Sequence, residues 1–397
     1  MDPRARRRIT AALLGATFLA SLEVVIVGPA MPAVVRELGG ARWYPWLFST
    51  YALAQTLSTP LWGALADRVG RRDAFLAGIG LFLAGCCACA SAPDTATLVA
   101  ARLVQGLGAG AILPITLTLF GDLYPVAERT RLQGVFSFVW GLSSLAGPLL
   151  GGALTDTLGW RSVFAINLPP GLIAVAVIAR AVPRALGRGG QAAEGPFAGM
   201  ALLLRDRTQQ AITAAGLGLG AALLGVVSFT PLWVQGVRGG TSADAGLHVL
   251  PMSLCWTAAA AVAGRLIPAR GDRFTVRVGA VLVAVGTAGA AVVPASVAGL
   301  AVFGAGMGLL VASFTVAGQE AAPLALRGQA SALGLFARGL GGAVAVPLLG
   351  VLVGFGPEAA GGSPNLEAGL GRAFFAVAAC AAAAAAVVFW RFPATRR

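Results

Sequence analysis

The sequence predicts an all-α polytopic membrane protein, with twelve transmembrane helices in two pseudo-symmetric six-helix halves. Its mean hydropathy is +0.81, and apolar runs of about 20 residues, long enough to cross a bilayer as a helix, recur along the chain. Only 11% of the residues are charged, and every basic residue is an arginine. These arginines fall between apolar runs. We therefore interpret the net charge of +13 as an indication of membrane topology rather than of nucleic-acid binding.

The apolar segments follow one another closely. The basic stretch before the first one is typical of a secretion signal, but Glu23 interrupts that run and further runs follow, which favours a first transmembrane helix. The five cysteines lie inside apolar runs and predict buried free thiols rather than a disulfide framework or a metal cluster. The predicted helices cover residues 9–35, 43–66, 74–92, 95–123, 131–157, 160–182, 208–235, 243–267, 274–293, 296–321, 327–354 and 370–391.

The arginines predict the orientation of the chain. With the N-terminus in the cytoplasm, 22 of the 29 arginines fall on the inner side and 5 on the outer side, and Arg102 and Arg338 lie within helices. This bias follows the positive-inside rule along the whole chain, and a missed helix would have inverted it. We therefore expect a multi-pass protein of the cell membrane, inner or plasma, with both termini in the cytoplasm.

An internal repeat predicts the two halves. GLGAG at Gly106–Gly110 matches GAGMG at Gly304–Gly308, and PLLG at Pro148–Gly151 recurs at Pro347–Gly350. The longest polar stretch, 183–207, then becomes a cytoplasmic linker between an N-terminal half, 1–182, and a C-terminal half, 208–397. Two parallel halves with substrate bound between them are a known transporter architecture.

The stretch GALADRVGRRDAFL concentrates charge in the predicted turn between the second and third helices. Asp67 ends the second helix, where the helix dipole is negative, so its carboxylate needs a cation or the N-terminus of another helix. Gly63 and Gly70 allow a close approach and a sharp turn, and Asp73 is placed to cap the third helix. A solvated anchoring loop is the alternative, but it explains only the arginines of the turn, Arg68, Arg71 and Arg72.

Three motifs resemble the major facilitator superfamily. GALADRVGRR resembles the signature loop of that family, RLVQGLGAG at Arg102–Gly110 its Arg-x-x-Gln-Gly motif, and GLSSLAGPLLGG its helix-5 antiporter motif. The first helix and GWRSVFAINLPPG at Gly159–Gly171 resemble drug:proton antiporters, which usually have fourteen helices. This chain departs from them in having twelve, with Glu23 and Val25 where aspartate and threonine are usual. The helix-5 motif contributes Gly141, Gly147, Pro148, Gly151 and Gly152.

The resemblance implies a secondary active transporter that exports hydrophobic or amphipathic compounds in exchange for protons by alternating access. A lipid or glycolipid transporter of the same fold is the alternative, because an apolar cavity serves both cargoes. A single histidine and the lack of a phosphate-binding lysine motif argue against a membrane enzyme. We expect a monomer in contact with membrane lipid, with no cofactor, no metal and no nucleic-acid partner.

Ionisable groups at membrane depth cost about 2.5–3.5 kcal/mol each on insertion scales, so each is a functional candidate. At 1.5 Å per residue, Glu23 lies about 12 Å from Met31 at the outer end of its helix, and Arg102 about 10 Å into the fourth helix. Their similar depths allow them to pair. We predict that Glu23 carries the proton with Arg102 as its partner; a fixed ion pair that only joins two helices is the alternative.

The remaining predictions concern a cavity and two helix contacts. Arg338 has no acid in its own helix; it could pair with Glu320, attract an anionic substrate or lipid headgroup, or be structural. The glycines of the fifth predicted helix should pack closely against a neighbouring helix, and we expect the eighth predicted helix, 243–267. Such a tight contact would suppress leak through the transporter; ordinary packing of small residues is the alternative. A cytoplasmic gate should bring Asp67 to the N-terminus of helix 11 near Arg327–Ser331, joined by Arg71 or Arg131. The cavity residues are Gln55, Trp140, Trp233 and Arg338, although packing or interfacial anchoring is the alternative for both tryptophans.

Overall fold

A computed structural model of the chain describes residues 3–124, 126–183, 198–323, 326–355 and 365–392. Side chains at positions 3, 126–134, 136, 137, 198 and 327 lie outside that description. The chain forms two compact units, one of residues 1–39 and 50–196 and the other of residues 40–49 and 197–397. Each unit is described by itself below.

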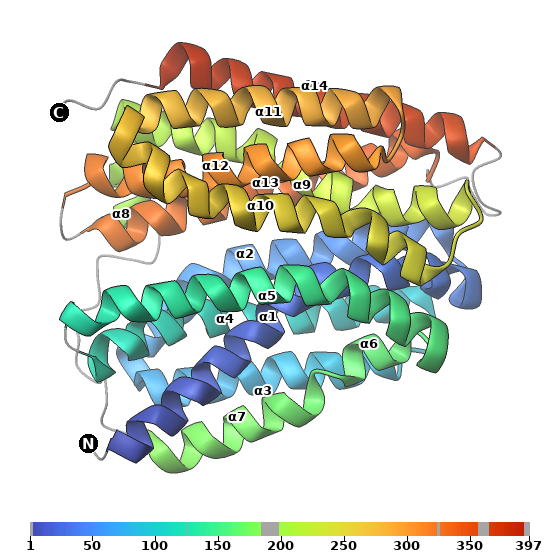
Figure 1. Cartoon of the computed structure of the whole chain (residues 1–397). Coiled ribbons are helices and arrows are strands. Elements are labelled where there is room, and N and C mark those ends of the chain that lie inside the picture. The colour runs from blue at the N-terminus through green and yellow to red at the C-terminus, as the bar shows by residue number, and fades with distance from the viewer. Residues whose placement is uncertain (1–2, 125, 184–197, 324–325, 356–364, 393–397) are drawn as a thin grey trace. The chain divides into compact units, whose positions relative to one another are not determined.

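The first unit is built from long helices and contains no strand in its described part (Figure 1). α2 begins in the short segment that belongs to the second unit and continues into the first. The helices are α1 (Pro3–Leu38), α2 (Tyr44–Val69), α3 (Arg71–Ala90), α4 (Thr95–Leu123), α5 (Val126–Leu158), α6 (Arg161–Ala165) and α7 (Leu168–Ala181).

The second unit likewise consists of helices and their connecting turns, with no strand among its described residues. The short helix α8 lies within the segment 183–207, which the sequence predicts to be only a linker. The elements are η1 (Ala41–Trp43), α8 (Ala198–Leu203), α9 (Arg207–Gly236), α10 (Ser242–Arg270), α11 (Asp272–Val292), α12 (Val297–Ala321), α13 (Arg327–Val353) and α14 (Leu366–Arg391).

The succession of apolar helices confirms the predicted fold class. Among the described residues, 11 helical segments are long and apolar enough to cross a membrane, with α6 and α7 together forming one of them. α2 is not among the 11, although its 26 residues give it a comparable length. Polar residues in its middle, including Gln55, Thr56 and Ser58, lower its mean hydropathy.

The sixth predicted helix, 160–182, is broken in the structure. Pro169 and Pro170 have no N–H, so the carbonyls of Ala165 and Ile166 cannot receive the bonds that would continue the helix. The N–H of Asn167 instead donates to the carbonyl of Phe164 at 3.3 Å, and a new helix, α7, follows. The break places Asn167 between two helical segments, inside the span.

The two glycine-rich stretches GLGAG and GAGMG make similar helix contacts, each inside its own unit. A Cβ atom added at Gly108 of α4 would lie 2.7 Å from the carbonyl oxygen of Gly78 in α3. A Cβ added at Gly306 of α12 would lie 2.7 Å from the carbonyl oxygen of Gly279 in α11. Both glycines therefore let two helix backbones approach closely, as small residues do in membrane bundles.

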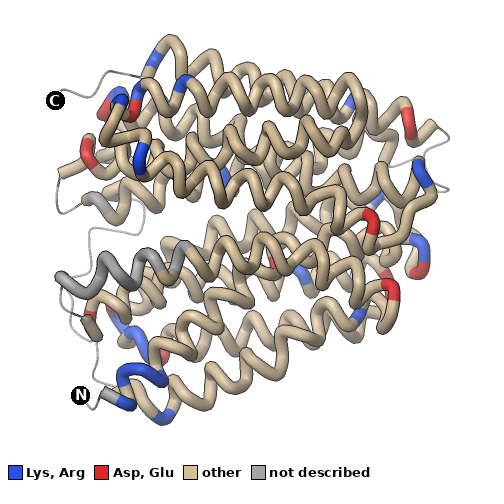
Figure 2. Tube along the Cα trace, viewed as in Figure 1, with Lys and Arg blue, Asp and Glu red and all other residues tan. Residues whose placement is uncertain are grey.

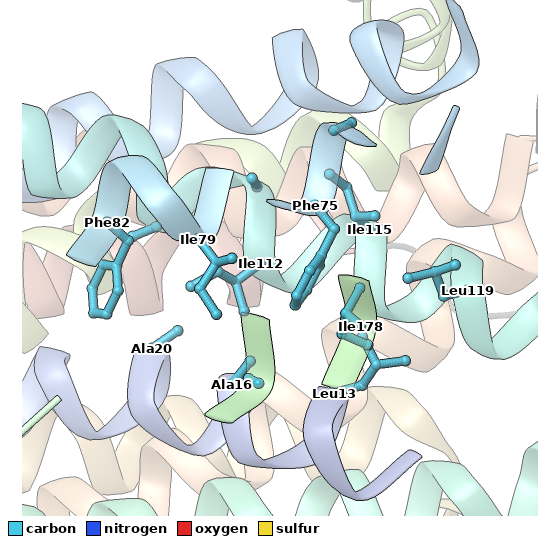
Figure 3. Close-up of a cluster of buried hydrophobic side chains, with 14 of the residues drawn as sticks. Leu13, Ala16, Ala20, Phe75, Ile79, Phe82, Ile112, Ile115, Leu119 and Ile178 are labelled. Atoms are coloured by element: carbon cyan, nitrogen blue, oxygen red, sulfur yellow. The ribbon is translucent and has the colours of Figure 1, made fainter. Parts of the chain in front are cut away.

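Apolar side chains from five helices, α1, α2, α3, α4 and α7, form the core of the first unit, part of which is drawn in Figure 3. In lipid, such side chains stabilise the unit through dispersion and close fit rather than by leaving water. The cluster includes Leu13, Ala16 and Ala20 of α1, Phe75, Ile79 and Phe82 of α3, Ile112, Ile115 and Leu119 of α4, and Ile178 of α7.

Charged residues gather at the helix ends of each unit and leave the middle of the helices almost free of them (Figure 2). This distribution is expected when the helix middles lie in hydrocarbon, where a charge is costly. Glu23 and Arg102 are exceptions, and both are almost completely buried.

We expect Gly108→Ala to lower the free energy of unfolding by about 1–3 kcal/mol, the usual cost of overpacking a tight contact. The added methyl group would meet the backbone of α3, which cannot move as a flexible side chain can. Chemical unfolding in detergent micelles would measure the change. Gly80→Ala is the matched control, because no described atom lies within 4 Å of a Cβ there. Equal stability of the two variants would contradict the prediction.

Candidate functional site

A buried ion pair lies inside the first unit. The carboxyl group of Glu23 on α1 is fully buried, and Arg102 on α4 is 2% exposed. Arg102 donates from Nη1 to Oε1 of Glu23, so the two residues that the sequence places at similar depth are in contact. A buried carboxylate is tolerated only with such a partner, because an isolated charge is strongly disfavoured there.

Two amide side chains complete the hydrogen bonding of the pair. Asn167 donates from Nδ2 to Oε2 of Glu23 at 2.8 Å, so each carboxyl oxygen accepts one bond from a different residue. Gln105 accepts from Nη1 of Arg102 at 2.7 Å and donates from Nε2 to Sγ of Cys86 at 3.2 Å. The four residues Glu23, Arg102, Gln105 and Asn167 are called the buried polar cluster below.

Aromatic rings cover the guanidinium group of Arg102. Its Cζ lies 4.2 Å from the ring centroid of Tyr51 on α2 and 5.8 Å from that of Phe164 on α6. Such cation–π contacts favour a desolvated guanidinium. The hydroxyl of Tyr51 and Oδ1 of Asn167 are buried without a hydrogen-bond partner among the described atoms.

The sequence alone pointed to Glu23 and Arg102 but not to Gln105, Asn167 or Tyr51. Gln105 is the glutamine of the Arg-x-x-Gln-Gly motif, and Asn167 stands next to the prolines that break the sixth span. A polar residue next to helix-breaking prolines within an apolar run could therefore have indicated Asn167 as a candidate site residue. Their convergence on Glu23 depends on helix packing and could not be read from spacing.

The charged turn between α2 and α3 joins helices of the first unit. Arg71 forms an ion pair with Asp122 of α4 and donates to the carbonyl of Thr118 at 3.2 Å. Arg72 donates to the carbonyl of Ala179 on α7 at 2.5 Å. Gly70 has φ of +99°, a conformation that favours glycine, and makes the sharp turn as expected.

Other residues of the turn differ from the prediction. Asp73 does not cap α3, because Gly70 occupies the N-cap position without a side-chain bond; Asp73 pairs with Arg72 instead. Gly63 makes no close approach, since no described atom lies within 4 Å of an added Cβ. Asp67 is half-buried and Arg68 exposed, and neither has a hydrogen-bond or ion-pair partner among the described residues. The side chain of Arg131 lies outside the described residues.

The helix-5 motif presses on α1 within the first unit, a contact that the sequence did not predict. A Cβ added at Gly147 would lie 3.2 Å from Cβ of Val25, and one added at Gly151 would lie 3.2 Å from Cα of Ile26. Ser143 of the same motif accepts a hydrogen bond from Ser21 at 2.8 Å. These small residues, on the helix that also carries Pro148, Gly141 and Gly152, hold α5 against the part of α1 that bears Glu23.

The comparisons with known proteins identify the family. Residues 13–346 match the family model described as Major Facilitator Superfamily. The chain belongs to the Major Facilitator Superfamily. It is 28% identical over 408 residues to the multidrug transporter protein MdtP of Bacillus subtilis (strain 168), which covers 88% of this chain and 75% of the relative. It is 38% identical over 168 residues to multidrug resistance protein 3 of the same organism, a match that spans only 42% of this chain and 33% of the relative.

Solved structures show the same superfamily fold. The D-xylose–proton symporter aligns with a TM-score of 0.76 at 16% identity, over 98% of each chain. A bacterial homologue of the human lysosomal transporter Spinster aligns with a TM-score of 0.81 at 17% identity, over 99% of this chain and 98% of that one. The family match and the named relatives make the protein a transporter rather than an enzyme, as the sequence predicted.

The predicted cavity residues of this superfamily transporter are divided between its two units. Gln55 is half-buried on α2, and Trp140 is 37% exposed on α5. Trp233 on α9 is 6% exposed and packs edge-on against Phe374 of α14, with ring centroids 6.4 Å apart. Arg338 on α13 is half-buried and forms no hydrogen bond or ion pair within the described part of the chain, so Glu320 is not its partner here.

Proposed function

We propose that this transporter exports hydrophobic or amphipathic compounds in exchange for protons by alternating access, with Glu23 as the proton carrier. The observation that carries the proposal is the fully buried carboxyl group of Glu23 between Arg102 and Asn167. The names of the relatives, a multidrug transporter and a multidrug resistance protein, support this class of substrate.

The chemistry of the pair suits reversible protonation. Burial favours the neutral acid, whereas the guanidinium of Arg102 favours the carboxylate, so two opposing effects act on one group. Alternating access changes the hydration of Glu23 and its distance from Arg102, and the balance changes with them. A proton bound on one side of the membrane can then be released on the other. Protonation also removes a charge that an occluded apolar state would disfavour.

A cationic substrate could couple to this step by competing with the proton for the same carboxylate. Exchange would then need no further machinery, because the two ligands exclude each other at Glu23. We place the substrate cavity between two functional halves, 1–182 and 208–397, joined by the linker 183–207. The protein would be a monomer in the cell membrane, with both termini in the cytoplasm.

Transport by the purified protein in liposomes tests the proposal. With an imposed pH gradient, ethidium is expected to accumulate in the acidic lumen of vesicles with the protein inserted in the matching orientation. A protonophore should abolish the accumulation, and added ethidium should drive a measurable proton movement. Ethidium that only equilibrates, or a fluorescent phospholipid that crosses in its place, would contradict proton-coupled export of amphipathic compounds.

The turn that contains Asp67 forms a cytoplasmic gate in this proposal. The carboxylate of Asp67 sits at the end of α2 and has no partner within the described part of the chain. Contact with the N-terminus of α13, near Arg327–Ser331, would satisfy it in the outward-facing state. Arg71, already paired with Asp122, would hold the turn in place.

We expect Asp67→Asn to favour the inward-facing state several-fold, since a carboxylate at a helix N-terminus contributes about 0.3–1 kcal/mol and up to about 2 kcal/mol when partly buried. Labelling of single cysteines placed in the cavity would measure the change in accessibility, alongside the ethidium transport rate. Asp73→Asn is the control, because its carboxylate accepts from Arg72 within the turn. Unchanged labelling and unchanged transport in Asp67→Asn would refute the gate.

A further inference from the structure

The amide of Asn167 is the one side chain of the buried polar cluster whose hydrogen bonding is incomplete. Its Nδ2 donates to Oε2 of Glu23 at 2.8 Å and to the carbonyl oxygen of Phe164 at 3.4 Å. Its Oδ1 is buried and accepts no hydrogen bond from any described atom. A buried unpaired carbonyl is costly, so this arrangement calls for an explanation.

The other amide of the cluster is fixed in one orientation. Oε1 of Gln105 accepts from Nη1 of Arg102 at 2.7 Å and from Sγ of Cys89 at 3.6 Å. Nε2 of Gln105 donates to Sγ of Cys86 at 3.2 Å. Exchanging the oxygen and nitrogen of Gln105 would place an NH₂ group against a guanidinium, which only donates. Asn167 has no comparable restraint on Oδ1.

The same rule decides where a proton can sit on Glu23. Oε1 faces the guanidinium of Arg102, which has no acceptor, so an acid O–H on Oε1 would meet another donor. Oε2 faces the amide of Asn167, which carries both a donor and an acceptor. The proton must therefore bind Oε2, and Asn167 must present an acceptor there.

We propose that Asn167 is a positioning residue that holds both charge states of Glu23 by rotating its amide by half a turn. In the ionised state Nδ2–H donates to Oε2. When a proton from water binds Oε2, the rotated amide places Oδ1 there and accepts the new O–H. The unpaired carbonyl gains a donor, and Nδ2 gives up its long bond to the carbonyl of Phe164. The inference rests on the proposed function of Glu23 as the proton carrier and adds the group that makes its neutral form stable.

The surroundings leave Asn167 as the partner of the acid. The titratable and charged groups near Glu23 are Arg102 of α4, Tyr51 of α2 and the thiols of Cys86 and Cys89 on α3. The amide of Gln105 also reaches the carboxyl group, but its oxygen already accepts from Arg102 and cannot take the acid proton. On α5, Ser143 bonds to Ser21 of α1 rather than to Glu23. The break between α6 and α7 explains how Asn167 reaches the site, since Pro169 and Pro170 interrupt the helix beside it.

Isotope-edited infrared spectroscopy tests the inference without altering the site. The chain contains two asparagines, Asn167 and Asn365, so asparagine labelled with ¹³C at the side-chain carbonyl gives two assignable signals. Asn365→Ala removes the second signal; Asn365 is exposed and makes no side-chain cap bond to α14. In acid-minus-neutral difference spectra of this protein in lipid, the Asn167 carbonyl band should move to lower frequency as the acid band of Glu23 appears.

Both bands should disappear from the difference spectrum of Glu23→Gln. In Asn167→Leu the acid band of Glu23 should move to higher frequency, because its O–H loses the acceptor. The inference is overturned if the Asn167 band stays still while the Glu23 acid band appears, or if no Glu23 acid band forms over the pH range in which the protein stays folded. The first result would leave proton carriage by Glu23 intact, and the second would remove it as well.

Discussion

Proteoliposomes with Glu23→Gln are expected to show no ethidium accumulation when a pH gradient is imposed, a loss to the level of protein-free vesicles. Glutamine keeps the size of the side chain and can still accept from Arg102, but it cannot bind and release a proton. Gradient-free exchange of labelled for unlabelled ethidium should persist in this variant, with weaker ethidium binding because the carboxylate that attracts the cation is gone. Only the accumulation of ethidium against its own concentration gradient depends on a proton carried by Glu23.

Glu37→Gln is the matched control for this measurement. Glu37 lies on the same helix, α1, and also pairs with an arginine, Arg161, but half of its side chain is exposed. Ethidium accumulation by this variant should equal that of the wild type, because no buried carboxyl group is lost. If Glu23→Gln accumulates ethidium at the wild-type rate, Glu23 is structural and the coupling group lies elsewhere.

Arg102→Leu is expected to be the most destabilising single substitution of the buried polar cluster. Removing one partner of a buried ion pair costs about 3–5 kcal/mol, because the other charge stays buried without compensation. Glu23 would lose its charged partner and keep neutral donors such as Asn167, and Gln105 would lose its charged donor. The loss of unfolding free energy should be largest at high pH. There the folded variant must keep Glu23 either ionised without its cation or protonated, whereas the unfolded chain ionises Glu23 freely in water.

Chemical unfolding of Arg102→Leu, Glu23→Gln and the double variant would give a double-mutant cycle. The double variant should recover much of the loss, since both charges are gone, and the coupling energy should exceed 1 kcal/mol, within the range of contacting residues of about 0.5–3 kcal/mol. Additive effects of the two substitutions would show that the pair contributes no interaction energy. The ion pair would then be an incidental feature of the packing.

Much of this protein follows from local sequence properties. Apolar runs predict the helices because a bilayer-spanning helix must bury its backbone polar groups within one segment, and this requirement involves no distant residue. α4 shows the agreement, predicted at 95–123 and observed as Thr95–Leu123. The sixth span shows the limit, because its break at Asn167 depends on how two prolines are accommodated.

The sequence by itself determined the helical membrane fold and the family motifs, and it made Glu23 and Arg102 candidates, since a charge within an apolar run is costly wherever its partner lies. Only the tertiary structure decided which groups meet. It brought Asn167 and Gln105 to the ion pair, joined Arg71 to Asp122, and seated Gly147 and Gly151 on α1. These contacts join residues far apart in the chain, and helix packing, not spacing, sets which faces touch.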